Sequence, residues 1–220
     1  MYKIYMHMYI KTLQEISDRY APSRILSFNM VHVLIALQLI ETRGHISRNL
    51  LCKELNLGEG SIKTLVKHLK TQNIIETSST GTRLSNSHKK YFAKLLSCIP
   101  AECKMPICSI AIGKFNYAVL LRLQRFTIRS GIEQRDAAIK MGAIGATTLL
   151  YKNNKFIMPG KTYDSLGREP GIQKLLTEQL QPIEGDIIIV ASAIEDEKIA
   201  EFSAKSAALW TIMNHGNHSE

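Results

Sequence analysis

Polar and basic side chains alternate with apolar ones between Glu59 and Gln72. The polar members are Ser61, Lys63, Thr64, Lys67, His68 and Lys70. Short hydroxyls near the start of a helix can reach base edges in a major groove, and lysines one and two turns later lie near phosphates. The pattern predicts a helix face that contacts DNA, with Ser61, Lys63, Thr64 and Lys67 as the main reading residues.

The flanking sequence predicts the elements that hold this face. Ser47 suits the N-cap of a helix with Leu50, Leu51 and Leu55 inward, and Asn56-Leu57-Gly58 ends that helix. A second helix starts near Glu59. Its apolar residues recur at the spacing of one helix face. They are Ile62, Leu65, Val66 and Leu69.

A β-hairpin is predicted directly after the second helix. Ile74 to Thr77 is rich in β-branched residues, Ser78 to Gly81 has turn composition, and Thr82 to Ser85 returns as a strand. A positive hairpin tip beside the reading helix would meet flanking phosphates or the minor groove. We therefore expect Thr80, Thr82 and Arg83 to contact the DNA backbone.

Helix, turn, helix and hairpin in this order resemble the winged-helix transcription regulators of archaea and bacteria, over residues 25 to 97. Those regulators usually leave the recognition helix through Gly-Leu-Ile or Gly-Ile-Ile, where this chain has Asn73-Ile74-Ile75. Asn tolerates a left-handed backbone, so Asn73 can replace the glycine in the turn that follows the recognition helix. The resemblance implies DNA binding and a buried first helix in Phe28 to Ile40. Winged helices also serve as protein-binding modules or as appendages on enzymes.

Charge is concentrated in the first half of the 220-residue chain. Residues 1–106 hold 15 Lys and Arg against 7 Asp and Glu, a net +8, and residues 107–220 hold 13 against 12, a net +1. A localised basic surface favours a polyanionic partner because neutralised phosphates release counterions. A solvated basic face is the alternative.

The length of the chain and the position of its prolines predict two α+β domains. Two prolines and short residues in Cys98 to Pro106 place the boundary near residue 105, giving domains 1–105 and 106–220. Met1 to Tyr20 is interpreted as an extra helix for dimer contacts, or as partly an artefact of starting at Met1 instead of Met6 or Met8. The start lacks a signal-peptide pattern and no segment suits a membrane span, so we expect a cytoplasmic protein.

Three cysteines near the boundary, Cys98, Cys103 and Cys108, raise the question of a metal site or a redox sensor. Structural zinc favours tight pairs completed by further Cys or His ligands, and the nearest candidate is His88. Small buried cysteines commonly pack without binding anything. We therefore predict no metal and no cofactor, with metal binding and redox sensing by these three cysteines as the alternatives.

The second half alternates strands and helices, which predicts a sheet layered with helices. Expected strands are 107–112, 117–123, 147–152, 155–158 and 186–192, and expected helices are 131–142, 172–180 and 195–213. Asn153-Asn154 suits a tight hairpin turn, and Ile132, Ala138 and Ile139 form the expected apolar side of the first helix. The segments Gly131 to Pro159 and Gly185 to Leu209 resemble a domain of unknown function that follows a winged helix in some archaeal proteins.

Three spots in this half are candidate ligand sites. Gly131 with Arg135 and Asp136 lies at a helix start, which favours anions. Lys161 and Arg168 belong to a polar loop, and Glu195-Asp196-Glu197 suits either a hard cation or the dipole of the following helix. Helix capping and an ordinary surface loop are the alternatives for the first two. No phosphate-binding loop, nucleophile elbow or zinc-protease motif is present.

These observations predict a DNA-binding transcription regulator. A homodimer would present two recognition helices about one helical turn apart, and a small-molecule effector would shift the favoured spacing. We expect no catalytic residues. The alternatives are an enzyme with an appended winged helix, similar in length and order to archaeal riboflavin kinases, and a protein-binding adaptor.

Overall fold

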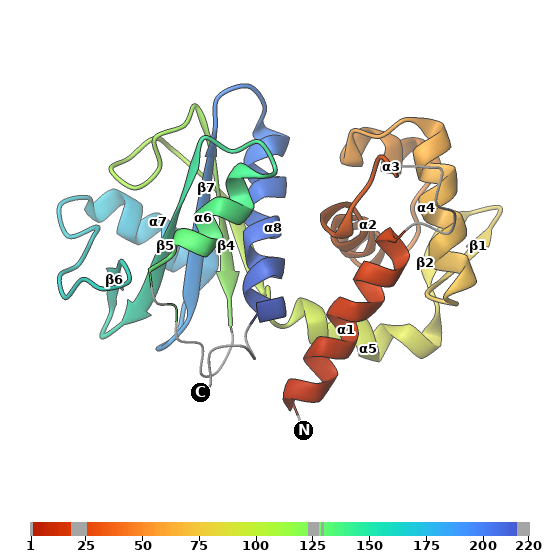
Figure 1. Cartoon of the computed structure of the whole chain (residues 1–220), viewed down its shortest axis with the longest axis horizontal. Coiled ribbons are helices and arrows are strands. Elements are labelled where there is room, and N and C mark those ends of the chain that lie inside the picture. The colour runs from red at the N-terminus through yellow and green to blue at the C-terminus, as the bar shows by residue number, and fades with distance from the viewer. Residues whose placement is uncertain (1, 19–25, 123–127, 129, 215–220) are drawn as a thin grey trace. The chain divides into compact units, whose positions relative to one another are not determined.

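The computed structural model describes residues 2–18, 26–122, 128 and 130–214, and the chain divides into two compact units (Figure 1). Unit 1 ends at Leu96 and unit 2 begins at Ser97. The prediction of an α+β protein with two domains is confirmed. The boundary lies earlier than the predicted position near residue 105, because Ala101–Met105 is a strand of the unit 2 sheet.

Unit 1 consists of five helices and one hairpin among its described residues. They are α1 (Tyr2–Ser17), α2 (Met30–Arg43), α3 (Arg48–Leu55), α4 (Glu59–Thr71), β1 (Ile75–Ser78), β2 (Gly81–Leu84) and α5 (Asn86–Leu96). Ser47 Oγ accepts a hydrogen bond of 3.2 Å from the Leu50 amide at the start of α3, as predicted. Asn73 has a φ of 57° between α4 and β1, the left-handed backbone expected there.

The first helix belongs to the core of unit 1. Ile10, Leu13 and Ile16 of α1 are buried, and the helix packs against α2, α4 and α5. Ile10, Leu13 and Ile16 are therefore not available for the dimer contact that was predicted for this segment. Met1, where the choice of start was raised, lies outside the described residues.

Unit 2 is a five-stranded sheet with helices on both faces. Its elements are β3 (Ala101–Met105), β4 (Phe115–Leu121), α6 (Ile132–Ile139), β5 (Gly145–Lys152), β6 (Lys155–Ile157), α7 (Pro170–Leu180), β7 (Ile187–Ala193) and α8 (Glu197–Asn214). The strand order is β3-β4-β7-β5-β6 and every neighbouring pair is antiparallel. Asn153 and Asn154 have φ of 52° and 58°, which forms the predicted tight turn between β5 and β6.

The alternation of side chains along β4 and β7 separates two packed layers. Ala118, Leu120, Ile188 and Val190 join the core under α7, whereas the residues between them face α6 and α8. Figure 1 shows α7 on one side of the sheet and α8 on the other. The four alanines of α8 at positions 200, 204, 207 and 208 are fully buried, so this long helix lies close to the strands.

Two parts of the unit 2 prediction are wrong. Residues 107–112 form a tight turn, in which Cys108 and Ala111 exchange backbone hydrogen bonds of 3.0 and 3.1 Å, and Ile107 and Ile112 are exposed. On α6, Ile132 and Ile139 are also exposed, because the helix buries Gln134, Ala137 and Ala138 instead.

Some predicted features cannot be compared with the structure. Leu123, at the end of a predicted strand, lies outside the described residues. Among the described helices, none has the length and apolar character needed to span a membrane.

Candidate nucleic-acid interface

Helix α4 has one buried apolar face and one basic face. Ile62, Leu65 and Leu69 are completely buried. Lys63, Lys67 and Lys70 are exposed and follow one another at intervals of four and three residues, so they form a single stripe. Among the described residues, no acidic side chain forms an ion pair with any of these lysines. The stripe therefore presents positive charge that the unit itself does not neutralise.

Hydroxyl groups accompany the lysine stripe. Ser61 and Thr64 are half-buried, and Thr64 Oγ1 donates to the Gly60 carbonyl at 2.9 Å. Thr71 is exposed and donates to the Lys67 carbonyl at 3.0 Å. In both threonines the hydroxyl proton is used by the helix backbone, so each can offer only its lone pairs outward. Sequence reasoning missed Thr71, although it lies seven residues after Thr64 on the same side.

His68 does not belong to the exposed face, and its prediction as a DNA contact is wrong. It is 6% exposed, and its Nδ1 lies 2.7 Å from the carbonyl oxygen of Ile16. Because a carbonyl only accepts, Nδ1 carries the proton and donates it. The Phe28 ring meets the imidazole edge-on at 5.7 Å. Packing of α1 extends the buried stripe of α4 to include His68.

The hairpin lies beside Ile46, which forms an isolated antiparallel bridge with Thr82. The Ile46 amide donates a hydrogen bond to the Thr82 carbonyl at 3.0 Å, and the Thr82 amide donates to the Ile46 carbonyl at 2.9 Å. Gly81 has a φ of 129°, and a Cβ there would lie 2.9 Å from the Ile46 carbonyl oxygen, so this close approach requires glycine. The Thr82 side chain is buried by the same contact. The prediction that Thr82 contacts DNA is therefore wrong.

Arg83 and Thr80 remain on the exposed side of the hairpin. Arg83 bonds Glu76, its partner across the two strands, with Nη2 and Nε 2.7 and 3.1 Å from Oε2. Thr80 Oγ1 lies 2.7 Å from Ser78 Oγ at the turn. Arg83 is accessible to a partner, but its charge is offset by Glu76, which sequence reasoning did not include.

Unit 1 carries further exposed lysines outside α4. Lys89 and Lys90 are exposed at the start of α5. Residues 1–96 hold 14 Lys and Arg against 6 Asp and Glu, a net +8, whereas residues 97–220 hold 14 against 13, a net +1. The positive charge of the chain is therefore a property of unit 1.

The predicted ligand residues at α6 are held by local contacts. Gly131 has a φ of 77° at the helix start. A Cβ added at this position would lie 3.1 Å from the Thr148 side chain, so both the backbone conformation and the packing favour glycine. Arg135 bonds Asp136 at 3.1 Å, and both are half exposed. Ser130 Oγ accepts from the Ile132 amide at 3.3 Å. These contacts account for the glycine and the helix start by folding alone.

The loop with Lys161 and Arg168 has its own internal structure. Asp164 accepts bonds from the Leu166 amide at 3.0 Å and the Gln173 amide group at 2.6 Å. Lys161 and Arg168 are exposed, and no hydrogen bond or ion pair links either side chain to the start of α6 among the described residues. The structure does not bring the two predicted ligand spots into one bonded site.

The acidic run before α8 is used by the fold. Asp196 Oδ1 accepts from the Lys198 amide at 3.0 Å, and Glu197 pairs with Lys104 of β3 at 2.7 Å. These acids cap the helix start and bind a neighbouring strand, which matches the dipole interpretation.

A charged cluster is buried between α8 and the sheet. Lys205 is 2% exposed, and its Nζ lies 2.9 Å from Glu102 Oε1 and 2.7 Å from Glu201 Oε1. Glu102 Oε2 is buried without a hydrogen-bond partner. Burial, followed by these two carboxylates, raises the pKa of the nearby Tyr117 phenol. The cluster links β3 to α8.

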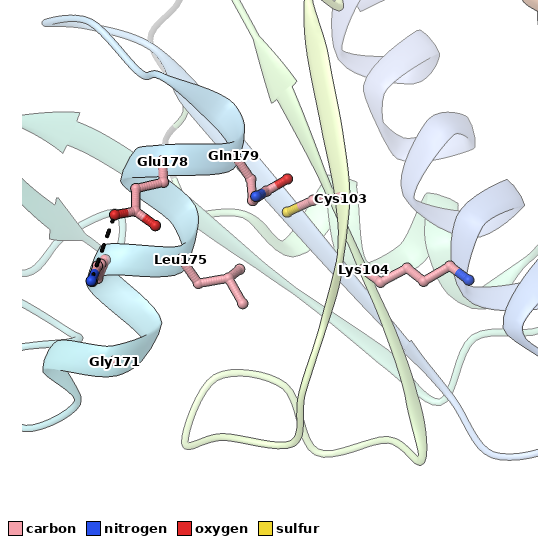
Figure 2. A pocket seen from close by; sticks show the side chains of 7 residues that line it. Cys103, Lys104, Gly171, Leu175, Glu178 and Gln179 are labelled. Carbon is pink, nitrogen blue, oxygen red and sulfur yellow. Dashed lines mark ion pairs between the residues drawn. The ribbon is translucent and has the colours of Figure 1, made fainter.

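A groove of about 410 Å³ lies between β3 and α7 (Figure 2). Cys103 points toward Leu175 and Gln179 of α7, and Lys104 points to the opposite side of the strand. Lys174 and Glu178 pair at 3.8 Å along the rim.

The three cysteines near the unit boundary, Cys98, Cys103 and Cys108, have raised pKa values. Burial raises the pKa of Cys98 and Cys103 to about 11, and it also raises the pKa of Cys108. Metal ligation and oxidation both need the thiolate. Within the described residues, no group of three His, Cys, Asp or Glu side chains is arranged to hold a metal ion.

Comparison with known proteins gives two family matches and a structural relative. Residues 30–90 match the PH0730-like, N-terminal domain, and residues 112–212 match a domain of unknown function, DUF4443. Hypothetical protein PH0730 from Pyrococcus horikoshii OT3 is similar in structure, with a TM-score of 0.66 and 25% identity. The similarity covers 88% of this chain and 95% of that one. No curated protein matches the chain.

These matches support the resemblance expected for the second half of the chain, and they do not name the one expected for the first half. The expected domain of unknown function in the second half is confirmed, and the similar solved protein is archaeal. Neither family match names a winged-helix regulator. The chain is thus similar, over nearly its whole length, to an archaeal protein described as hypothetical.

Proposed function

We propose that unit 1 is a winged helix-turn-helix that binds double-stranded DNA in a transcription regulator. In this proposal α3 and α4 form the helix-turn-helix, α4 lies in the major groove, and the β1–β2 hairpin is the wing. The observation that carries the proposal is the stripe of Lys63, Lys67 and Lys70, which are exposed on α4 and lack acidic partners among the described residues. Exposed lysines on a helix that fits a groove are suited to phosphates.

The proposed contacts differ in what they contribute. Lys63, Lys67 and Lys70 supply affinity through the backbone. Ser61, Thr64 and Thr71 offer lone pairs to donors on base edges, which gives sequence preference. The wing supplies Arg83 and Thr80. The charge of Arg83 is partly offset by its ion pair with Glu76. The near-neutral unit 2 serves to join two copies or to bind an effector.

The first test is binding of the purified full chain to a labelled duplex of random sequence, followed by fluorescence anisotropy across a salt series. The proposal predicts binding whose affinity falls steeply with salt, with a slope of about −0.9 for each phosphate neutralised. Absence of binding at low salt overturns the proposal. Binding that is insensitive to salt also contradicts it, because the lysine stripe would then contribute nothing.

A further inference from the structure

We propose that two copies of this chain pair through the free edge of β3, forming a continuous ten-stranded sheet across a two-fold axis. Strand β3 is at one end of the sheet, and among the described strands it pairs with β4 alone. No hydrogen bond from another described segment satisfies the backbone of Ala101–Met105 on its outer side. An uncovered edge strand is a template for a further strand.

The opposite edge of the sheet is covered, which makes the free edge of β3 distinctive. On β6, the Phe156 carbonyl accepts from the Ser165 amide at 2.8 Å. The Met158 amide donates to Ser165 Oγ at 3.1 Å. The loop after β6 thus blocks strand addition at that end, and β3 has no comparable cover within the described chain.

The sequence of β3 is self-complementary when it pairs with itself. An antiparallel register centred on Cys103 puts Glu102 opposite the partner's Lys104, and Lys104 opposite the partner's Glu102. In β3, Glu102 and Lys104 align with Val119 and Tyr117 of β4, so both are on the α8 face. Opposite charges directly across two strands stabilise the pair, here in addition to the ion pairs of Glu102 with Lys205 and of Lys104 with Glu197 within each chain. The two-fold axis produces this favourable contact twice.

The groove beside β3 provides room on the other face. Ala101, Cys103 and Met105 alternate with the charged residues and face α7. The groove of about 410 Å³ between β3 and α7 is where the partner's Cys103 would lie (Figure 2). The same two-fold axis brings both α7 helices to one face of the joined sheet. The exposed Lys174 and Glu178 of each α7 could then contact opposite charges on the partner.

This interface is independent of DNA binding, although it would serve the proposed function. Strand β3 begins soon after the chain enters unit 2 at Ser97. In the paired strands, the two Ala101 residues are separated by about 13 Å along the strand direction.

Sedimentation equilibrium without DNA tests the proposal, using the full chain. The wild type is expected to be a dimer. Lys104→Glu places two like-charged pairs across the axis, so its dimer dissociation constant should rise roughly tenfold or more. The control is Glu197→Gln, which removes the partner of Lys104 within the chain and should leave the dimer intact. A monomeric wild type, or a Lys104→Glu variant as dimeric as the wild type, overturns the proposal.

Disulfide trapping tests the register. Directly opposed residues in antiparallel strands are close enough for a disulfide. At alkaline pH, where a larger share of the Cys103 thiol is ionised, copper phenanthroline should therefore couple two wild-type chains, and Cys103→Ser should prevent the coupling. A dimer that forms without this coupling and is dissociated by Ile194→Lys would overturn the proposal and place the interface on the exposed Ile112, Ile144 and Ile194. Because no DNA is present, failure here leaves the proposed DNA binding standing.

Discussion

Arg83 and Glu76 face each other across the hairpin of unit 1, with Arg83 Nη2 2.7 Å from Glu76 Oε2. Both side chains are about half exposed, at 52% and 50%. An exposed ion pair of this kind contributes little to stability. Its larger effect is to offset the only arginine of the wing, so any phosphate that Arg83 binds must compete with Glu76.

Glu76→Gln is therefore expected to increase DNA affinity. The change removes a negative charge from the proposed contact surface and frees Arg83, which should strengthen binding about two- to fivefold at low salt. Anisotropy with the same duplex measures the effect. Glu54→Gln is the matched control, because Glu54 pairs with Arg43 at 3.8 Å on a different element of unit 1. Equal effects of the two changes, or weaker binding by Glu76→Gln, would contradict the role given to the pair.

His68 should matter for stability and leave DNA contacts unaffected. Its Nδ1 donates to the Ile16 carbonyl at 2.7 Å, in the last turn of α1, where carbonyls lack partners within the helix. His68→Phe keeps an aromatic ring but loses this bond, which should lower the free energy of unfolding by about 1–3 kcal/mol. Denaturant unfolding measures the loss. Salt-dependent DNA binding of the folded variant should match the wild type, and a reduced slope would show that His68 does face DNA.

Removal of Lys205 should destabilise unit 2 strongly. Lys205→Met leaves Glu102 and Glu201, whose side chains are 29% and 25% exposed, without their cation, at a cost of about 1–3 kcal/mol. Adding Glu102→Gln and Glu201→Gln should recover most of the stability, because the uncompensated charges are then gone. Thermal and denaturant unfolding of the two variants test this. A Lys205→Met variant as stable as the wild type would argue against the buried cluster.

His32 makes the stability of unit 1 sensitive to acid. Burial lowers its pKa from 6.5 to about 4, and its Nδ1 accepts from the Asn29 amide at 3.2 Å at the start of α2. Between those pH values the unfolded chain binds more protons than the folded chain. The contribution of His32 is therefore complete above pH 6.5 and is lost as the pH falls to about 4.

His32→Gln tests this dependence. Glutamine keeps an acceptor at the same position of the helix cap and does not titrate. The fall in unfolding temperature between neutral pH and the pH region of His32 protonation should be smaller in the variant than in the wild type. An unchanged fall would assign the acid sensitivity to other groups.

The elements of unit 1 could be predicted because their signals are local. Ser47 caps α3, apolar spacing defines the buried face of α4, and Asn73 takes the left-handed turn. His68 was misassigned because its environment depends on α1, which lies far away in the sequence. Glu76 could have been found: a two-residue turn after Ser78 puts it directly opposite Arg83.

In unit 2 the errors come from contacts distant in sequence. Ala101–Met105 is flanked by Pro100 and Pro106, which suggested a linker, yet prolines at both ends are compatible with a short edge strand. The strand depends on pairing with β4. Ile132 and Ile139 were expected inward because they are apolar, whereas Gln134 is buried through its bond of 3.1 Å to Thr211 on α8.

The most direct test of the central claim compares two pairs of lysines on unit 1 that carry the same charge. Lys63→Gln with Lys67→Gln alters the exposed face of α4, and Lys89→Gln with Lys90→Gln alters α5. The DNA affinity of each variant would be measured across a salt series. We predict that the α4 variant loses about two units of salt slope, while the α5 variant loses clearly less. Equal losses, or an α4 variant that binds like the wild type, would contradict the assignment of α4 as the DNA-binding helix.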